Sequence, residues 1–449
     1  MKKLEVLERT KSFCPICFRN LDSKIFEKND LLYIEKKCPE HGMFKERYIW
    51  DKEVYTTLKK LIPTTKKYPN GILLQITSKC NMKCPFCFED TVMKHGYHLN
   101  LKDIKKILKN FRGKIVHLSG GEPTLHKDFF KIVRFLKNNG YKVIVLSNGK
   151  MFSEKSFTKK AKTSGVDAVV LGFDSLDDNT LKFFRGEKSL EFKLNAIYNL
   201  QEYDIDICLF VVSMKGKNLK ETSELIRFSL NHNAVKRVEF EIPWKHGKII
   251  NFKETTPNDI IQEIENNFNI KKRDFLEFTT FLHLMYDVID KFKTKNISVE
   301  SVCYLKIWFL CVDDTIIPLN RMFNIRKMNI FLEDFRNSSS IIEFLRSFKS
   351  FPFFSLIDSF KNDIYFRKLI KGIFRVIFFG SELEKILPIK SIVIEETPID
   401  RNIDLDFTKT CNLYSVFTYD HSIGPSCIRQ MMVEKYYEKG VRKLRHLNG

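Results

Sequence analysis

Between residues 70 and 250, short apolar runs alternate with longer segments in which apolar residues recur every three or four positions. The apolar runs are ILLQIT, KIVHLSG, KVIVLSN, GVDAVVLGF, IDICLFVVS and VKRVEFEI. The intervening segments, such as LKDIKKILKNF and KDFFKIVRFLKNNG, have helical spacing. Six strand–helix units of this kind predict an α/β fold with a parallel sheet covered by helices. The pattern alone fits both a partly closed barrel and an open, doubly wound sheet.

The same pattern divides the chain into three regions, 1–65, 70–250 and 251–449. The first region contains two turn-like cysteine pairs, which predict a small metal-binding module, and PTTKKYPNG is its linker to the sheet. The third region predicts a mixed α+β cap that binds substrate. It holds two helical segments, the hairpin YLKIWFLCVDDTIIPL, a Phe-rich stretch at 348–380, and the hairpin TCNLYSVFTYDHSIGPSCI.

The net charge of +21 raises the question of a nucleic-acid partner. The basic residues are spread along the chain, and Lys, Ile, Asn and Phe all have A/T-rich codons. A solvated basic surface therefore explains the charge better than nucleic-acid binding. No apolar run has the length of a membrane-spanning helix. The basic N-terminus MKKLEVLERTKSF is not followed by an apolar run, so we expect no secretory signal. We expect a cytoplasmic protein in which clustered cysteines bind metal.

Three cysteines, Cys80, Cys84 and Cys87, follow directly after the first predicted strand of the sheet. Three thiolates at this spacing can hold three irons of a [4Fe–4S] cluster and leave the fourth iron without a protein ligand. An open coordination position is what catalysis at a metal requires. The alternative is a structural zinc knuckle.

The segment CNMKCPFC resembles the CxxxCxφC signature of the radical S-adenosylmethionine (SAM) superfamily, with the aromatic Phe86 at φ. The resemblance implies a partial (β/α)6 barrel of the TIM type. It also implies that the cluster donates an electron to SAM and releases a 5′-deoxyadenosyl radical, with Cys80, Cys84 and Cys87 as its catalytic ligands. Further residues match the superfamily's SAM-binding segments at the predicted strand ends: Gly120, Gly121, Glu122, Pro123, Ser147, Asn148, Asp174 and Arg185.

For these residues, simpler structural roles remain open. Glu122 could be a surface helix cap instead of part of a segment that binds the SAM amino group. Paired Gly120 and Gly121 let a backbone approach a ligand closely. Arg185 resembles the cation expected near the SAM carboxylate, which a guanidinium suits.

The N-terminal region carries CxxC followed about twenty residues later by CxxH, which are Cys14, Cys17, Cys38 and His41. This spacing predicts a closed, tetrahedral site of the zinc-ribbon type, in which three cysteines and one histidine hold zinc or iron. The alternatives are an unmetallated knuckle, or a site of the three cysteines alone in which His41 only lines the turn.

The combination of CPICF…CPEHG with a radical SAM core resembles the archaeal family of tetraether lipid synthase and hydroxymethylpterin methyltransferases. That family has an extra cysteine-rich insert before the barrel and a further C-terminal cysteine. In this chain PTTKKYPNG runs directly into Ile72 without the insert, and acidic residues around Glu395 stand in place of the cysteine. The resemblance leaves one auxiliary Fe–S cluster as an expectation, on Cys303, Cys411 and Cys427 with Cys311 as a further candidate ligand. The alternative is that these cysteines are buried and inert. Cys208 lies within a strand and is expected in the core.

The resemblance predicts an enzyme that activates a C–H bond of an isoprenoid lipid or a pterin-type molecule, ending in C–C coupling or methylation. A reductant such as ferredoxin or flavodoxin is expected. The segments FPFFSLID and LIKGIFRVIFFG mix Phe and Ile with Lys and Arg, so peripheral contact with a membrane surface is a further hypothesis. Two alternatives stay open: radical modification of RNA or a peptide, and an electron-transfer or scaffold protein that never cleaves SAM. A pure electron carrier normally gives its cluster four protein ligands, which argues against the latter.

Overall fold

In the computed structural model, fourteen stretches of the chain have a described structure, and the statements below concern those residues. They are 6–17, 19–28, 31–48, 51–62, 69–87, 96–109, 111–243, 255–291, 303–312, 315–321, 324–337, 389–395, 413–416 and 423–425.

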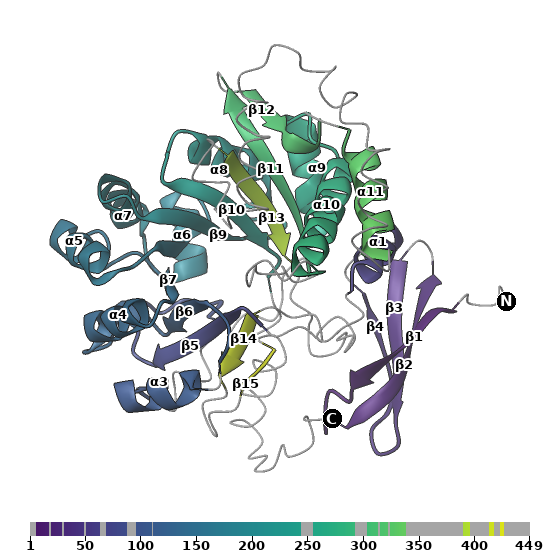
Figure 1. Cartoon of the computed structure of the whole chain (residues 1–449), viewed down its shortest axis with the longest axis horizontal. Helices are drawn as coiled ribbons and strands as arrows, with labels where there is room; N and C mark the ends of the chain where they lie inside the picture. The colour runs from purple at the N-terminus through teal and green to yellow at the C-terminus, as the bar shows by residue number, and fades with distance from the viewer. Residues whose placement is uncertain are drawn as a thin grey trace.

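The N-terminal region forms a four-stranded antiparallel meander in the order β1–β2–β3–β4, beside the main sheet (Figure 1). Its strands are β1 (Val6–Phe13), β2 (Asn20–Lys28), β3 (Leu31–Cys38) and β4 (Gly42–Arg47). Helix α1 (Lys52–Lys60) follows, capped by Asp51, whose side chain accepts from the N–H of Val54. Residues of this module, including Ile34 and Leu58, belong to the same buried cluster as the barrel. The module is therefore packed onto the rest of the protein.

Six parallel strands in sequence order make the centre of the main sheet, as the sequence predicts. They are β5 (Gly71–Thr77), β6 (Ile115–Gly120), β7 (Lys142–Ser147), β8 (Ala168–Gly172), β9 (Asp206–Val212) and β10 (Val235–Glu241). Alternate residues such as Val116, Val145 and Leu209 are fully buried on one face. This alternation gives the sheet an outer face for helices and an inner face for chemistry.

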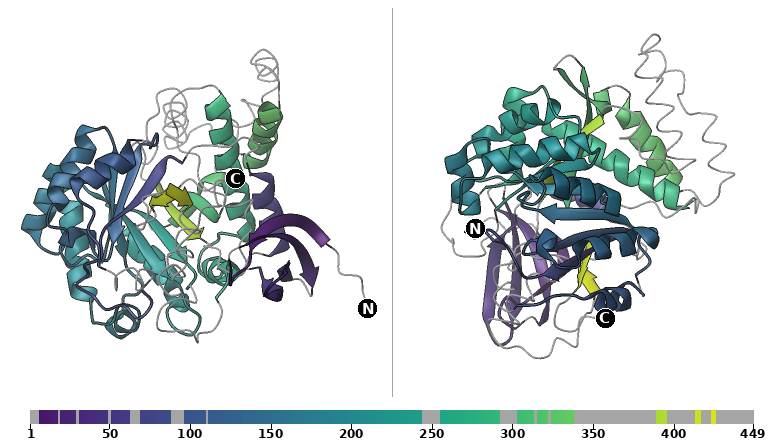
Figure 2. Two further views of the ribbon diagram at one scale, coloured as in Figure 1. Left: turned by 90° about the horizontal axis from the view of Figure 1, so that it is seen from below. Right: turned by 90° about the vertical axis from the view of Figure 1, so that its left-hand side faces the viewer.

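Helices cover the outer face of this curved sheet, which makes it a partial (β/α)6 barrel (Figure 2). They are α3 (Leu101–Leu108), α4 (Phe129–Asn138), α5 (Lys155–Ser164), α6 (Asp178–Arg185), α7 (Leu190–Glu202) and α8 (Thr222–Leu230), with the short 3₁₀ helices η1 (Pro123–Leu125) and η2 (Leu219–Glu221). The carboxyl ends of the strands therefore share one edge, where open α/β sheets place their ligands.

The region after residue 251 adds strands to both edges of the barrel sheet, giving eleven strands in all among the described residues. Strand β13 (Ile389–Glu395) pairs in parallel with β10, and β14 (Leu413–Val416) pairs in parallel with β5. The two predicted hairpins are confirmed as β11 (Tyr304–Val312) with β12 (Thr315–Pro318), and β14 with β15 (Ile423–Pro425). The sequence pattern did not predict β13 or the pairing of β14 with β5.

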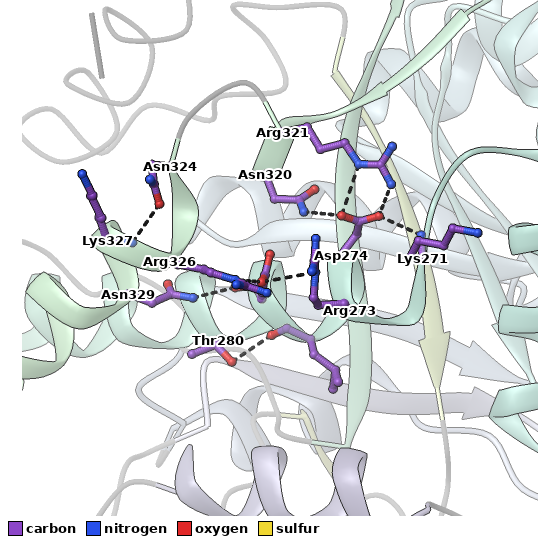
Figure 3. Close-up of polar contacts among 12 residues, drawn as sticks. Lys271, Arg273, Asp274, Thr280, Asn320, Arg321, Asn324, Arg326, Lys327 and Asn329 are labelled. Atoms are coloured by element: carbon purple, nitrogen blue, oxygen red, sulfur yellow. Dashed lines mark hydrogen bonds and ion pairs between the residues drawn. The ribbon is translucent and has the colours of Figure 1, made fainter. Parts of the chain in front are cut away.

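Helices α9 (Pro257–Asn267) and α10 (Lys272–Lys291) contact Asp51, the cap of α1, and α11 (Ile325–Asn337) packs against α10. The Asp274 carboxylate near the start of α10 accepts from Asn320, from Arg321 and from the backbone N–H of Lys271 (Figure 3). Asn320 and Arg321 belong to η3 (Leu319–Arg321), so this network fixes the end of the β11–β12 hairpin on α10. Lys272 in turn reaches the cap of α1, with Nζ 2.6 Å from Asp51.

Candidate active site

The cysteine loop, residues 78–87, leaves the end of β5 and lies against the ends of the neighbouring strands. The thiols of Cys80, Cys84 and Cys87 are partly exposed. Burial raises the pKa of Cys80, and the nearby Glu122 and Cys84 raise it further. Three partly exposed thiols on one loop fit a [4Fe–4S] cluster that the loop binds on one side, which leaves the other side open to a small ligand.

Gly120 and Gly121, at the end of β6, leave room for the backbone that enters the cysteine loop. Gly120 has φ of +133°, and a Cβ there would lie 2.1 Å from the carbonyl oxygen of Thr77. A Cβ on Gly121 would lie 2.4 Å from the carbonyl oxygen of Lys79. The backbone N–H groups of Gly121 and Glu122 donate to those same carbonyls at 2.8 and 2.7 Å. The close neighbour of both glycines is thus the protein's own loop, and the binding of SAM by this segment stays a prediction.

Glu122 is buried, with 1% of its surface exposed, and its carboxylate is held by protein groups. One oxygen accepts from the Thr124 hydroxyl at 2.6 Å and from Ser147 at 3.0 Å, and the other accepts from the N–H of Asn148 at 2.7 Å. Burial raises the pKa of Glu122, while these hydrogen bonds oppose the rise. Glu122 is the N-cap of η1, which begins at Pro123. It is therefore a helix cap, but a buried one and not one on the surface.

The end of β7 is tied to the cysteine loop through Asn148. Its side-chain amide donates to Oδ1 of Asn81 at 2.8 Å, and Lys150 reaches both the carbonyl of Asn81 and Glu187. Ser147 accepts from the N–H of Gly149 while it donates to Glu122. Ser147 and Asn148 therefore meet Glu122 and the loop, as the sequence predicts for residues of one site.

Asp174 and Arg185 form a buried two-point ion pair at the end of β8. Nε and Nη2 of Arg185 donate to the two carboxylate oxygens of Asp174, which is fully buried. Asp174 also accepts from the N–H of Val212 at 3.0 Å, and the guanidinium interacts with the thiol of Cys84. Two nitrogens of the Arg185 guanidinium, Nε and Nη2, are thus taken by Asp174, and a contact of Arg185 with a ligand carboxylate stays a prediction.

Phe86 packs in the cysteine loop against α6, with ring centroids 5.3 Å from Phe183 and 5.6 Å from Phe184. Just beyond α6, a Cβ on Gly186 would lie 2.5 Å from the carbonyl oxygen of Lys83. The loop is thus clamped between α6 and the ends of β6 and β7. These contacts fix the backbone of the loop that carries the three cysteines.

Lys193, in α7, belongs to the site although no motif in the sequence pointed to it. It is fully buried, and its ammonium donates to the carbonyl oxygens of Asn148 at 3.0 Å and Gly172 at 2.5 Å. Burial and the charge of Arg185 lower its pKa to about 7, against the opposing charges of Asp174 and Cys84. No sequence signal marked Lys193, because its burial and its two carbonyl partners are visible only in the folded structure.

The N-terminal module brings Cys14, Cys17, Cys38 and His41 together, with all four ligand atoms within 4.8 Å of one another. Burial alone would raise the pKa of Cys38, but hydrogen bonds from His41 and from backbone N–H groups lower it to about 6. A thiolate donor and a nearby imidazole form the donor set that zinc prefers. This geometry fits the predicted site of three cysteines and one histidine.

Of the residues proposed for an auxiliary cluster, only Cys303 has a described side chain, and it is partly exposed. Cys411 and Cys427 lie outside the described residues, as does the side chain of Cys311. The auxiliary cluster stays a prediction. Cys208 is partly exposed on the inner face of the sheet, which corrects our expectation of a core residue.

Among the described residues, no helix is both long and apolar enough to cross a membrane.

Two protein-family models match the chain, one within the barrel and one over the N-terminal module. The description "Radical SAM superfamily" matches residues 74–229. The description "HMPTM N-terminal zinc ribbon domain" matches residues 6–51. A radical SAM domain implies a [4Fe–4S] cluster and SAM as cofactors, and the zinc ribbon implies zinc in the N-terminal module.

Curated relatives match over different lengths. The chain is 26% identical over 360 residues to 7,8-dihydro-6-hydroxymethylpterin dimethyltransferase of Methanocaldococcus jannaschii, which covers 71% of each chain. It is 28% identical over 177 residues to the probable GTP 3′,8-cyclase of Pyrococcus horikoshii, covering 38% of this chain and 56% of the cyclase. The solved structure of Streptococcus suis SuiB bound to S-adenosylmethionine matches at 16% identity with a TM-score of 0.38, over 53% of this chain and 68% of that one.

Proposed function

We propose, from the premise that this chain is a radical SAM enzyme, that it activates a C–H bond of a pterin-type molecule and that the reaction ends in methylation. The observation that carries the proposal is the similarity to the pterin dimethyltransferase, which extends over 71% of both chains and so beyond the superfamily domain at 74–229. The zinc ribbon at 6–51 supports it, because its family description names the same group of proteins.

In this proposal Cys80, Cys84 and Cys87 hold the cluster, and the strand ends at Gly120–Pro123, Ser147 and Asn148 bind SAM. When bound, the cluster and SAM together supply a 5′-deoxyadenosyl radical that takes a hydrogen atom from the substrate. The cysteine loop stays in place because α6 and Asn148 hold it. A fixed loop lets SAM and substrate meet in one geometry.

Glu122, Asp174 and Arg185 act in this proposal as positioning residues. The polar atoms of both carboxylates are taken up by protein donors, so backbone groups are better placed than these carboxylates to contact SAM. The Asp174–Arg185 pair places a positive charge beside Cys84. A cation there stabilises a thiolate ligand.

A radical SAM enzyme needs a one-electron reductant, and we propose ferredoxin or flavodoxin in that role. The isoprenoid-lipid alternative depends on the Phe-rich stretch at 348–380, which lies outside the described residues. Within the described part of the chain, no feature favours a lipid over a pterin.

The test is anaerobic reconstitution with iron and sulfide, followed by reduction with SAM that carries a CD3 methyl group and with 7,8-dihydro-6-hydroxymethylpterin. We expect 5′-deoxyadenosine and a pterin product whose mass includes the label. Cys84→Ala should lose the cluster and both products. Lys83→Ala, which changes an exposed residue of the same loop, should keep them. Formation of 5′-deoxyadenosine without label in the pterin would overturn the substrate and leave the radical chemistry standing.

A further inference from the structure

Four neighbouring strands lie in the order β11–β13–β10–β9 (Figure 1). Their register places polar residues in rows across one face of the sheet. Residues paired across neighbouring strands lie on the same face, so the register defines each row. Starting furthest from the carboxyl ends of β9, β10 and β13, the rows are Trp308–Ser391–Arg237–Cys208, Lys306–Val393–Glu239–Phe210 and Tyr304–Glu395–Glu241–Val212.

These rows lie on the inner face of the barrel. The residues between them, such as Leu209, Val238 and Ile392, are at most 1% exposed and belong to the core under the outer helices. In the rows themselves, 34% of the Arg237 side chain and 16% of the Glu239 side chain are exposed. The side chains of Arg237 and Glu239 therefore keep surface that a small molecule can reach.

The register pairs Glu395 directly with Glu241, and Glu239 lies two residues earlier in β10 on the same face, so three carboxyl groups lie close together. Burial and these neighbouring carboxyl groups raise the pKa of Glu395 well above its ordinary value, which favours its protonated form. Arg237 lies 3.5 Å from Glu239, and the thiol of Cys208 lies 3.7 Å from it. Glu239 and Glu395 thus offer one proton donor and several acceptor lone pairs to a ligand.

Two buried polar atoms in the first row have no hydrogen-bond partner within the described structure. They are the hydroxyl of Ser391, a residue 1% exposed, and Nε1 of Trp308, a residue 8% exposed. The two residues are paired directly across β13 and β11, and Ser391 is paired with Arg237 on its other side. A buried donor left unpaired costs free energy, and a ligand on this face would supply the missing partners.

We propose that Glu239 and Glu395, together with Trp308, bind a planar heterocycle through a 2-amino-4-oxopyrimidine edge. This inference rests on the proposed function and names the site for its substrate. A carboxylate accepts two adjacent N–H groups of such an edge, as it does from a guanidinium. The indole N–H donates to the carbonyl oxygen of the same edge. Pterins and guanine share this edge, so either ring satisfies the chemistry.

The location of the rows suits a substrate site that faces the SAM-binding strand ends. Gly172, whose carbonyl is held by Lys193, pairs with Phe210, and Phe210 pairs with Glu239. Two strand spacings, roughly 10 Å, separate Gly172 from Glu239. A ring anchored at Glu239 can therefore extend its far side toward the end of β8. An isoprenoid chain would place hydrocarbon against Glu239, Glu395 and Arg237 and offer them no hydrogen bond, which is costly.

The experiment compares two ligands that differ only at the 2-position. The reconstituted full chain with SAM is titrated with 6-hydroxymethylpterin and with 6-hydroxymethyllumazine, in which an oxygen replaces the 2-amino group. We expect lumazine to bind at least tenfold more weakly. Guanosine forms the third arm, and the tighter of guanosine and the pterin identifies the source of the edge.

Three variants locate the contact. Glu239→Gln should weaken pterin binding at least tenfold and leave lumazine binding nearly unchanged, so the discrimination shrinks. Trp308→Phe keeps the ring that packs 5.6 Å from Phe278 and should weaken both ligands, since both carry the carbonyl. Glu191→Gln, at an exposed position of α7, should change neither. Thermal melting of each variant confirms that it folds.

Equal binding of pterin and lumazine overturns this site, as does the absence of binding by both pterin and guanosine. Unchanged discrimination in a folded Glu239→Gln variant also overturns it. The methyl label measured in the same wild-type samples reports on the proposed function separately. If the label enters the pterin but the Glu239→Gln variant discriminates between pterin and lumazine as the wild type does, the proposed binding site is wrong and the proposed function is retained. If no label enters, the pterin reaction falls whatever the titrations show.

Discussion

The buried carboxylates of this protein fall into two kinds, and the difference lies in what surrounds each one. Glu122 and Asp174 each accept several hydrogen bonds from neighbouring protein groups and hold strand ends together. Glu395 instead faces two further carboxyl groups, with Arg237 as a compensating charge. The first kind stabilises the fold, whereas the second costs stability and is typical of binding sites.

Replacing Glu395 with Gln should stabilise the protein, and the gain should grow with pH. Below the ordinary glutamate pKa of 4.5, residue 395 is protonated in the folded and unfolded states alike. As pH rises through the interval up to the raised folded pKa, only the unfolded state loses the proton, so wild-type stability falls. Gln has no proton to lose. Thermal melts should show a gain of about 2 °C or more at pH 8 and a smaller one at pH 5.

The exposed substitution Glu191→Gln provides the control, because it should show no such pH trend. A gain for Glu395→Gln that is the same at both pH values would mean that Glu395 ionises normally in the folded protein.

Lys193→Met should weaken SAM binding and lower stability. The substitution removes the donor to two buried carbonyls, Asn148 and Gly172, at the ends of β7 and β8. Leaving buried acceptors unpaired costs about 1–3 kcal/mol. We expect a lower melting temperature and a SAM dissociation constant raised at least tenfold, read from the change in the cluster's spectrum. Lys188→Met, at an exposed position nearby, should leave both unchanged.

The residues of the site could be predicted where a motif carried them, and not where only the tertiary structure does. The cysteine triad and the strand-end segments were found because their chemistry requires fixed spacing along the chain. Lys193 is different, since its partners, Asn148 and Gly172, are brought to it by the packing of α7 across two strands. Cys208 was placed in the core because a strand's sequence does not tell which of its faces is inner.

At the scale of elements, the six parallel strands could be predicted because each is a short apolar run followed by a helical segment. Strand β13 was missed because its sequence, IKSIVIE, follows the long stretch 338–388 and no helical spacing around it suggested a strand–helix unit. Its pairing with β10 depends on contacts between distant parts of the chain, which a local pattern cannot encode.

The glycine pair makes a testable link between two elements. Gly121→Ala should displace the cysteine loop, because the new Cβ would lie 2.4 Å from the carbonyl of Lys79. We expect incomplete cluster assembly, seen as a lower iron count per chain after reconstitution. Gly140→Ala strains a turn with φ of +78° but meets no atom within 4 Å, so it should lower stability and keep the iron. A wild-type iron count per chain in Gly121→Ala would show that the loop can shift and still bind the cluster.

For the whole molecule, zinc and iron should be held independently. Cys38→Ser removes a thiol from the four-ligand group of the N-terminal module, so zinc should fall to near zero while iron remains at the wild-type level. Metal analysis of the purified chain gives both values. Met43→Ser, which changes an exposed residue of β4, should keep both metals. Loss of iron together with zinc would show that the ribbon's fold supports the cluster through the shared core.

The strands at both edges of the barrel sheet have a consequence for the nascent chain. Strands β5 and β10 are complete early in translation, but their outer partners, β14 and β13, lie at 413–416 and 389–395. A ribosome-bound chain that has reached residue 330 therefore exposes two unpaired edges and the cysteine loop that follows β5. Open edges invite wrong pairing, and exposed thiols invite oxidation. We therefore expect the nascent chain to need protection from oxygen and from pairing with other chains until β13 and β14 have been synthesised.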